Sequence, residues 1–171
     1  RERGYPEAFA KQIYRQILGF GEYGFPEAHA ASFALLVYVS AWLKYHQPAA
    51  FTCALLNSQP MGFYAPAQLI QDVRRHGVQV KPIDVTVSDW ESTLEQDDEV
   101  LALRLGLHLI NGLSQTGAVR LLSARADRVF SDLQDFAQRT HLNKTDLQAL
   151  AAANAFIALV KSHRKMAYWE V

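Results

Sequence analysis

The feature that most constrains the fold is an apolar run over residues 28–43, which follows Pro26 and Glu27. Proline suits the first turn of a helix, where a missing N–H costs nothing, and a glutamate there complements the helix dipole. A helix over residues 26–46 would be about 32 Å long at 1.5 Å per residue. Because one histidine and two serines interrupt the run, it falls short of the roughly 18 uninterrupted apolar residues of a membrane span. We therefore expect a long buried helix.

Composition indicates a folded domain. Half of the 171 residues are hydrophobic, and 17 Lys+Arg balance 17 Asp+Glu, which excludes a disordered chain and allows one domain or two small ones. The single cysteine, Cys53, excludes an internal disulfide framework, so a reducing cytoplasm is expected. The chain starts at Arg1 with neither an initiator Met nor a signal pattern, so we expect a piece of a longer protein.

Charge is distributed unevenly. Residues 1–81 carry eight Lys+Arg and five Asp+Glu, a net charge of +3. Residues 82–110 carry one against seven, a net charge of −6, and residues 111–171 carry eight against five, again +3. Two mildly basic segments thus flank an acidic connector. An ordinary solvated surface and a site for a polyanion explain this asymmetry equally well.

Local patterns predict a mainly α fold with a small β element. Apolar residues four apart after Pro6 indicate an amphipathic helix that ends at Gly19, followed by a glycine-rich loop over residues 20–25. Further helices are expected over 48–56, over 66–76 with Gly77 as cap, from a turn at 109–114 to 125, after N-cap Ser131, from N-cap Asn143 to about 154, and over 156–168. Short strands are expected over 78–80, 85–87, 90–94 and 100–107, with a polar turn at 96–99.

Several chemistries are disfavoured. Residues 19–24 match G-x-G-x-x-G, but they follow a helix rather than a strand, so a dinucleotide site is not expected. The six histidines are scattered and no second cysteine is present, which argues against zinc. The pair Asp97-Asp98 lies in a predicted turn and more readily solvates it than binds Mg²⁺. No metal ligand and no catalytic residue is therefore assigned.

Two features remain as candidate sites. His29 lies in the first turn of the long helix, where an imidazole could touch a bound anion or sugar, although a capping or core-edge histidine explains the position as well. Residues 110–114 have the shape of a helix-hairpin-helix turn, in which backbone N–H groups grip a DNA phosphate, with Ser114 in place of a second glycine.

Taken together, these segments closely resemble the fingers region of bacterial C-family (DnaE-type) DNA polymerases, in the error-prone, ImuC-like branch. The resemblance covers nearly the whole chain. It is carried by residues 20–36, Tyr38, residues 41–51, 54–64, 74–85 and 103–107, and the hairpin at 111–114 through Ala155-Phe156.

The resemblance implies a fingers region over residues 1–100 and a tandem helix-hairpin-helix lobe over residues 101–171. In this family the loop and helix around the tyrosine-glycine-phenylalanine motif face the incoming deoxynucleoside triphosphate, and the histidine lies beside its sugar. The expected nucleotide-binding residues are Tyr23, Gly24, Phe25 and His29. The expected contacts to the duplex backbone are Asn111, Gly112, Leu113 and Ser114 in the first hairpin and Lys144 in the second. Asn154 stands where the family commonly has glycine, and asparagine can adopt the left-handed backbone of such a turn.

The family's catalytic aspartates, which hold two Mg²⁺, belong to a palm region N-terminal to this segment, so we expect the fragment by itself not to polymerise. The implied partners are template-primer DNA, an ImuB-like protein and, through it, the sliding clamp, in the cytoplasm and without a membrane. A non-catalytic DNA-binding or scaffold protein with the same architecture remains the alternative.

Overall fold

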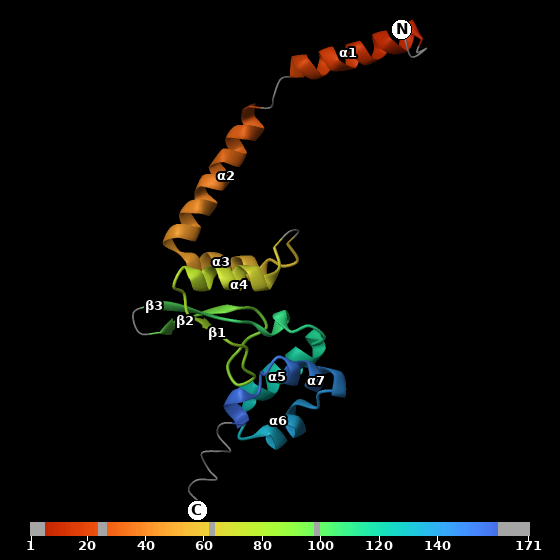
Figure 1. The fold of residues 1–171 in the computed structure, drawn as a ribbon. Coiled ribbons are helices and arrows are strands. Elements are labelled where there is room, and N and C mark those ends of the chain that lie inside the picture. Colours follow the sequence, from red (N-terminus) through yellow and green to blue (C-terminus); the bar gives the residue numbers. More distant parts are fainter. Residues whose placement is uncertain (1–5, 24–26, 62–63, 98–99, 161–171) are drawn as a thin grey trace, which may run out of the picture. The chain divides into compact units, whose positions relative to one another are not determined.

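The computed structural model describes residues 6–23, 27–61, 64–97 and 100–160. The chain divides into two compact units, residues 1–45 and 46–171. Helices dominate, and a three-stranded sheet lies in the second unit (Figure 1). The predicted mainly α fold with a small β element is therefore confirmed. The predicted division between residues 100 and 101 concerns regions of a parent protein and stays a prediction.

The first helix is longer than predicted. α1 (Glu7–Tyr23) passes through Gly19, where the sequence pattern placed its end. Glycine lowers helix propensity by about 1 kcal/mol but keeps its N–H, so it weakens a helix without stopping it. The expected loop at residues 20–25 is correspondingly shorter, and its residues 24–25 lie outside the described part of the chain.

The second helix, α2 (Glu27–His46), spans the apolar run as predicted. Its described side chains, from residue 29 onward, are exposed, with Phe33 at 53% and Tyr38 at 69%. The prediction of a buried helix is therefore wrong for this chain by itself. Apolar residues on every side indicate that a helix is packed against other segments, but they do not indicate which segments of the protein these are. Within the described residues, none of the helices has the length and apolarity that crossing a membrane requires.

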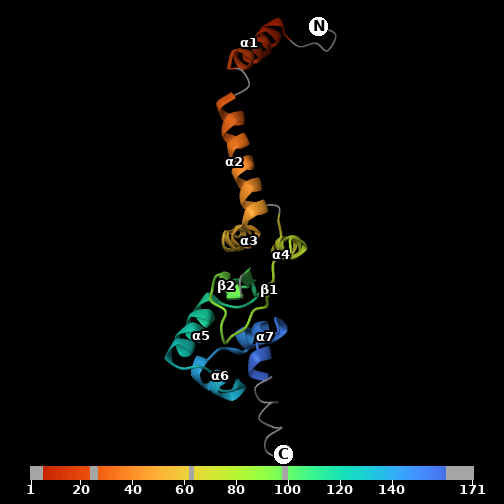
Figure 2. The same cartoon turned by 90° about the vertical axis from the view of Figure 1, so that its left-hand side faces the viewer.

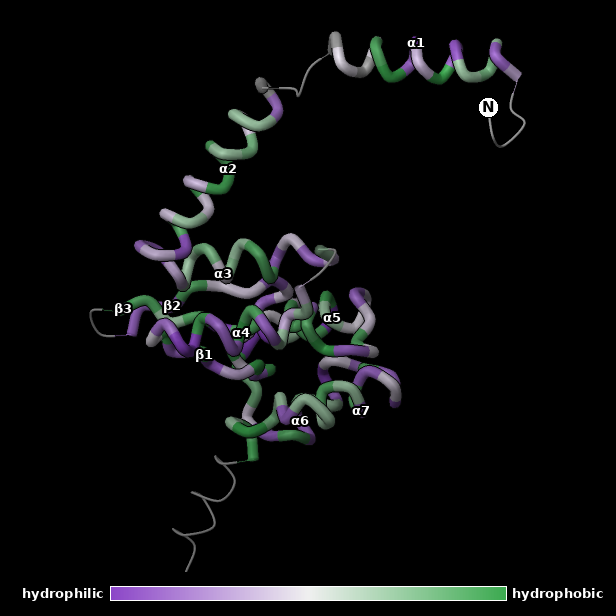
Figure 3. Tube along the Cα trace, turned by 45° about the horizontal axis from the view of Figure 1, so that its top comes forward, coloured by the Kyte–Doolittle hydropathy of each residue, from purple (hydrophilic) through white to green (hydrophobic). Residues whose placement is uncertain are grey.

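The second unit begins with α3 (Pro48–Asn57) and α4 (Pro66–Arg75), which lie side by side next to the sheet (Figure 2). Hydrophilic and hydrophobic residues alternate along α4 (Figure 3), and its apolar side buries Val73 against Leu56 and Leu103. Gly77 follows the helix with φ +80°, as predicted, because a residue without Cβ accepts this left-handed backbone.

The sheet has the strand order β1-β3-β2. Its strands are β1 (Val80–Lys81), β2 (Thr93–Asp97) and β3 (Val100–Arg104). β1 is parallel to β3, with Val80 opposite Leu103, and β2 is antiparallel to β3, with Leu94 opposite Leu103. The third strand thus connects the other two and buries Leu103 in the core next to α3 and α4.

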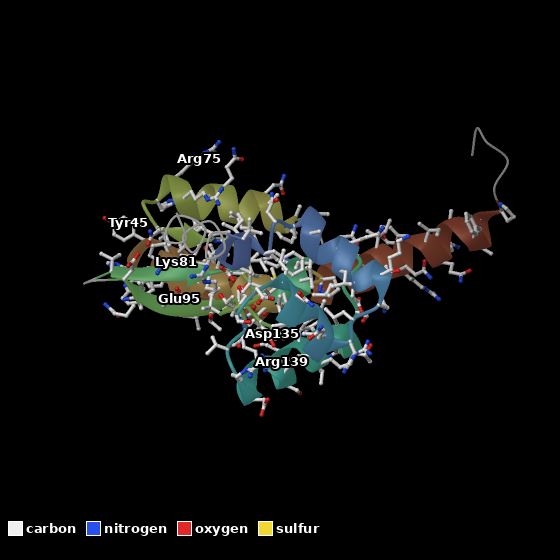
Figure 4. All side chains as sticks on the ribbon, turned by 90° about the horizontal axis from the view of Figure 1, so that it is seen from below. Tyr45, Arg75, Lys81, Glu95, Asp135 and Arg139 are labelled. Atoms are coloured by element: carbon white, nitrogen blue, oxygen red, sulfur yellow. The ribbon has the colours of Figure 1, made fainter. Side chains whose placement is uncertain are left out.

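One carboxylate links all three strands. Glu95 of β2 accepts a hydrogen bond from the Arg104 Nε at 2.7 Å, and the Lys81 Nζ lies 3.1 Å from its Oε2 (Figure 4). The Arg104 hydrogen bond, followed by the bond and charge of Lys81, lowers the pKa of Glu95 below its usual range despite partial desolvation. The network therefore favours the ionised carboxylate.

One strand prediction fails for a local reason, and the other predicted strands have different bounds in the structure. Residues 85–87 form a turn, because the Asp84 carboxylate accepts both the N–H of Thr86 at 2.8 Å and its hydroxyl at 2.7 Å. Such side-chain bonds compete with a sheet ladder and override the β propensity of valine and threonine. The strand predicted at 78–80 covers only Val80–Lys81, the one predicted at 90–94 runs from Thr93 to Asp97, and the one predicted at 100–107 ends at Arg104. Residues 96–97 of the predicted polar turn therefore belong to β2, and its residues 98–99 lie outside the described residues.

The rest of the second unit is a helical lobe, residues 107–160, which we call the C-terminal lobe. It contains η1 (Leu107–Leu109), α5 (Gln115–Asp127), α6 (Leu133–Thr140) and α7 (Lys144–Ala152). Its core is centred on Phe136, whose ring centroid lies 4.9 Å from that of Phe130 and 5.1 Å from that of Phe156. Leu121 and Leu150 are completely buried beside it. The core of the lobe also includes Val85 and is distinct from the cluster around Leu103.

The helix starts in the lobe follow side-chain caps. Asn143 caps α7 as predicted, because its Oδ1 accepts the N–H of Asp146 at 2.8 Å. α6 starts after Asp132 rather than after the predicted Ser131, since the Asp132 carboxylate accepts the N–H of Asp135 at 2.8 Å. Residues 157–160 are helical, and the rest of the helix predicted over 156–168 lies outside the described residues.

Candidate nucleic-acid interface

The first hairpin lies between η1 and α5. Its turn needs a backbone with φ +87° at Gly112, and the Leu113 N–H donates to the Ile110 carbonyl at 3.3 Å. Ile110 is buried in the core of the lobe, and Leu113 packs against that core. Asn111 and Gly112 are left exposed at the tip. The predicted hairpin residues are therefore adjacent in space and anchored from inside.

The start of α5 is held by two side chains. Ser114 is the N-cap, and its Oγ accepts the N–H of Gly117 at 2.9 Å. The Ser114 N–H donates to Asp146 Oδ1 at 2.8 Å, and the Ser114 hydroxyl donates to Asp146 Oδ2 at 3.0 Å. Asp146 belongs to α7 and is only 1% exposed. The Ser114 amide, predicted to contact DNA, thus already has an acceptor within the protein.

Other amides around the hairpin have no such acceptor. Among the described residues, no hydrogen-bond partner is found for the N–H groups of Asn111, Gly112, Gln115 and Thr116, and all four residues are exposed. N–H groups at a helix start, together with the positive end of the helix dipole, attract anions. Sequence reasoning missed Gln115 and Thr116, although their places as first and second residues after the N-cap are a usable signal.

A second turn follows α7. Asn154 has φ +54°, and the Ala155 N–H donates to the Leu150 carbonyl at 3.0 Å, so asparagine takes the left-handed position as predicted. The Ala155 carbonyl in turn accepts the Val85 N–H at 3.0 Å. The lobe therefore contains two tight turns that each join helical segments, one with glycine and one with asparagine in the left-handed position.

Few cations are available near these turns. Lys144, predicted to contact DNA, is the exposed first residue of α7, and among the described residues no acidic partner is found for it. Arg120 of α5 is exposed and donates to the His141 carbonyl at 3.2 Å, and the described part of the chain offers it no acidic partner either. Arg125 is instead bound to the Val85 and Ser88 carbonyls and to Asp89.

A carboxylate on α6 occupies two more arginines. Asp135 Oδ1 lies 2.9 Å from Arg128 Nη2, and its Oδ2 lies 3.1 Å from Arg139 Nη1 (Figure 4). The backbone N–H of Ser131, followed by the hydrogen bond from Arg139, holds the pKa of Asp135 below its usual range. These arginines serve the packing of the lobe, so Lys144 and Arg120 are its cations best suited to a ligand.

The residues predicted to bind a nucleotide are not brought together by the described part of the chain. His29 is exposed on α2, and its ring centroid lies 4.4 Å from that of Phe33 at a tilt of 55°. Tyr23 is the last residue of α1, while Gly24 and Phe25 lie outside the described residues. The nucleotide assignment stays a prediction.

Comparison with known proteins gives one match to the C-terminal half of the chain and further matches to nearly its whole length. Residues 77–166 match the family model of the helix-hairpin-helix motif. The error-prone DNA polymerase of Methylococcus capsulatus is 59% identical over 189 residues, which cover 99% of this chain and 18% of that protein. The error-prone DNA polymerase of Alkalilimnicola ehrlichii is 59% identical over 172 residues, covering 100% and 17%. That of Azoarcus sp. is 56% identical over 177 residues, covering 100% and 16%.

This chain therefore spans less than a fifth of the relatives that it matches. The resemblance found in the sequence to the error-prone branch of bacterial DNA polymerases is confirmed. The chain belongs to the helix-hairpin-helix motif family, and it corresponds to one segment of an error-prone DNA polymerase.

Proposed function

We propose that this chain is the part of an error-prone DNA polymerase that holds duplex DNA, and that its C-terminal lobe binds the sugar-phosphate backbone. The observation that carries the proposal is a group of four N–H donors, on Asn111, Gly112, Gln115 and Thr116, that have no partner within the described residues and lie at an exposed hairpin of the matched helix-hairpin-helix region. Backbone amides bind phosphate without reading the base, which suits a polymerase that must hold any sequence.

The charge of the lobe predicts weak binding. Residues 107–160 carry five Lys+Arg and four Asp+Glu, a net charge of +1. Lys144 and Arg120 are the two cations that remain for phosphates. Asn111, at the tip of the hairpin, is uncharged and adds no cation there. The isolated segment therefore relies on amides more than on charge, and the rest of the parent protein would supply most of the affinity.

The chemistry of nucleotidyl transfer is proposed to lie elsewhere in the parent. Among the described residues, no three His, Cys, Asp or Glu side chains gather so as to hold a metal ion. The described residues therefore do not provide the ligands that a site for two Mg²⁺ would need, and no step of nucleotidyl transfer is assigned to them. The aspartates that bind Mg²⁺ would lie in a palm region that this segment does not include.

The remaining contacts rest on the resemblance. His29, with Tyr23, Gly24 and Phe25, would face the incoming deoxynucleoside triphosphate at the start of α2, the histidine beside the sugar. An ImuB-like partner, and through it the sliding clamp, would recruit the parent polymerase to damaged DNA in the cytoplasm. The exposed His29 ring is compatible with contact to a ligand.

Duplex binding is tested by fluorescence anisotropy of a labelled duplex with the 171-residue chain. Two or three neutralised phosphates predict a slope of log K against log salt of about −1.8 to −2.7, hence binding roughly 12- to 40-fold weaker at 200 mM than at 50 mM salt. Lys144→Gln should reduce the slope by about 0.9. Lys11→Gln, which removes the same charge from α1, should leave it unchanged. Affinity that is equal at both salt concentrations would contradict the proposal.

A further inference from the structure

We propose that Asp146 is a positioning residue for the DNA-binding hairpin: it fixes the hairpin to α7 and thereby decides which amides remain for phosphate. The inference rests on the proposed duplex-binding function and adds a residue that makes no contact with DNA itself. Asp146 lies 32 residues from Ser114 in the sequence, yet the two form one hydrogen-bonded junction between α7 and the start of α5.

The junction uses both oxygens of the Asp146 carboxylate. Oδ1 accepts the Ser114 N–H at 2.8 Å, and Oδ2 accepts the Ser114 hydroxyl at 3.0 Å. The side chain is 1% exposed. A buried carboxylate is costly unless hydrogen bonds replace its water. The hairpin end therefore cannot move away from α7 without leaving buried carboxylate oxygens without these hydrogen bonds.

Gly117 provides the space for this carboxylate. A Cβ at this position would overlap Asp146 Oδ2 and would lie 2.9 Å from Ser114 Oγ. The Gly117 backbone does not have positive φ, so conformational freedom does not explain the glycine in the first turn of α5. Close approach of the Asp146 side chain does. The residue is thus a second, independent sign that the sequence is arranged around this contact.

The hydrogen bonds around the junction determine which backbone N–H groups of the hairpin already have an acceptor within the protein. The Ser114 N–H is taken by Asp146, the Leu113 N–H by Ile110, and the Gly117 N–H by Ser114. Among the described hairpin residues, the amides left unpaired are those of Asn111 and Gly112, which precede Leu113, and those of Gln115 and Thr116, which lie between Ser114 and Gly117. Asp146 therefore orients the phosphate-binding amides and withholds the Ser114 amide from DNA.

The affinity test compares two carboxylate removals in the 171-residue chain. Asp146→Ala should weaken binding to a labelled duplex about tenfold, because the hairpin amides lose their fixed orientation. Asp132→Ala is the matched control, since it removes the same charge and an N-cap bond, at α6. It should bind within about twofold of the unchanged chain. Asp146→Asn, which still offers an acceptor to the Ser114 N–H, should fall between them. Equal weakening by Asp146→Ala and Asp132→Ala overturns the positioning role.

A second measurement does not depend on DNA. Amide hydrogen exchange at Ser114 should accelerate at least tenfold in Asp146→Ala while the amides inside α5 and α7 keep their protection. If the unchanged chain fails to bind duplex, the proposed function falls, whereas unchanged exchange at Ser114 overturns the positioning role alone. If Asp146→Ala does not fold, Gly117→Ala decides: its methyl group displaces the carboxylate, so duplex affinity should again fall about tenfold, and unchanged affinity refutes the inference.

Discussion

Replacing Gly112 by alanine tests the hairpin through its backbone alone. A Cβ added there would have Ala149 Cβ as its nearest neighbour at 3.8 Å, an ordinary van der Waals distance. No clash therefore contributes. What remains is the backbone, which has φ +87°, well beyond the left-handed minimum near +57° that non-glycine residues visit.

The magnitude follows from two opposing effects. A left-handed backbone costs an L-residue about 1–2 kcal/mol, and φ +87° places the cost near the upper end. Alanine also restricts the unfolded chain, which stabilises the folded state by about 0.4–1 kcal/mol. The cost of the left-handed backbone is the larger of the two effects, so Gly112→Ala should lower the free energy of unfolding by about 1 kcal/mol. Gly112→Asn should cost about half as much, because asparagine tolerates this region better, as Asn154 does at φ +54°.

The assay is urea unfolding followed by the fluorescence of Trp90, which packs against the core of the C-terminal lobe. Trp42 and Trp169 are replaced by phenylalanine in every variant, so that Trp90 alone reports. Unfolding of Gly112→Ala at the same urea concentration as the parent would refute the strain argument. Equal losses for Gly112→Ala and Gly112→Asn would refute it too, since the cost would then come from the added side chain.

Two further predictions concern the other parts of the chain. Because the folded-state pKa of Glu95 is lowered, its ion pairs stabilise the fold above the unfolded pKa of about 4.3 and stop doing so as pH falls through the folded pKa. Glu95→Gln should thus cost about 1 kcal/mol at pH 7 and much less at pH 3 in urea unfolding, and an equal cost at both pH values would contradict the ion-pair explanation. In a full-length parent polymerase, His29→Ala should raise the ratio of ribonucleotide to deoxynucleotide incorporation, and an unchanged ratio in single-nucleotide extension would rule out a role beside the sugar.

Local chemistry explains which parts of the fold could be predicted from the sequence. Gly77, Asn143 and Asn154 each act on their own turn or helix end, and all three have the predicted roles. The strand expected at residues 85–87 fails because the Asp84 carboxylate forms a local turn that residue propensities do not contain.

The candidate site was predictable only in part. The turn at residues 110–114 has a sequence pattern, so it could be found. The Ser114–Asp146 junction could not, because its partners are 32 residues apart and nothing in either neighbourhood marks the other. Without knowledge of that junction, the Ser114 amide looks available for a phosphate.

The exposed α2 has a consequence for how such a polypeptide is made in a cell. A helix of this length forms within about a microsecond, whereas a bacterial ribosome adds only about 5–20 residues per second. Its aromatic and aliphatic side chains, Phe33 and Tyr38 among them, are therefore displayed while the residues that follow are still being synthesised. During that interval the nascent segment exposes apolar surface, and such surface promotes association with other chains.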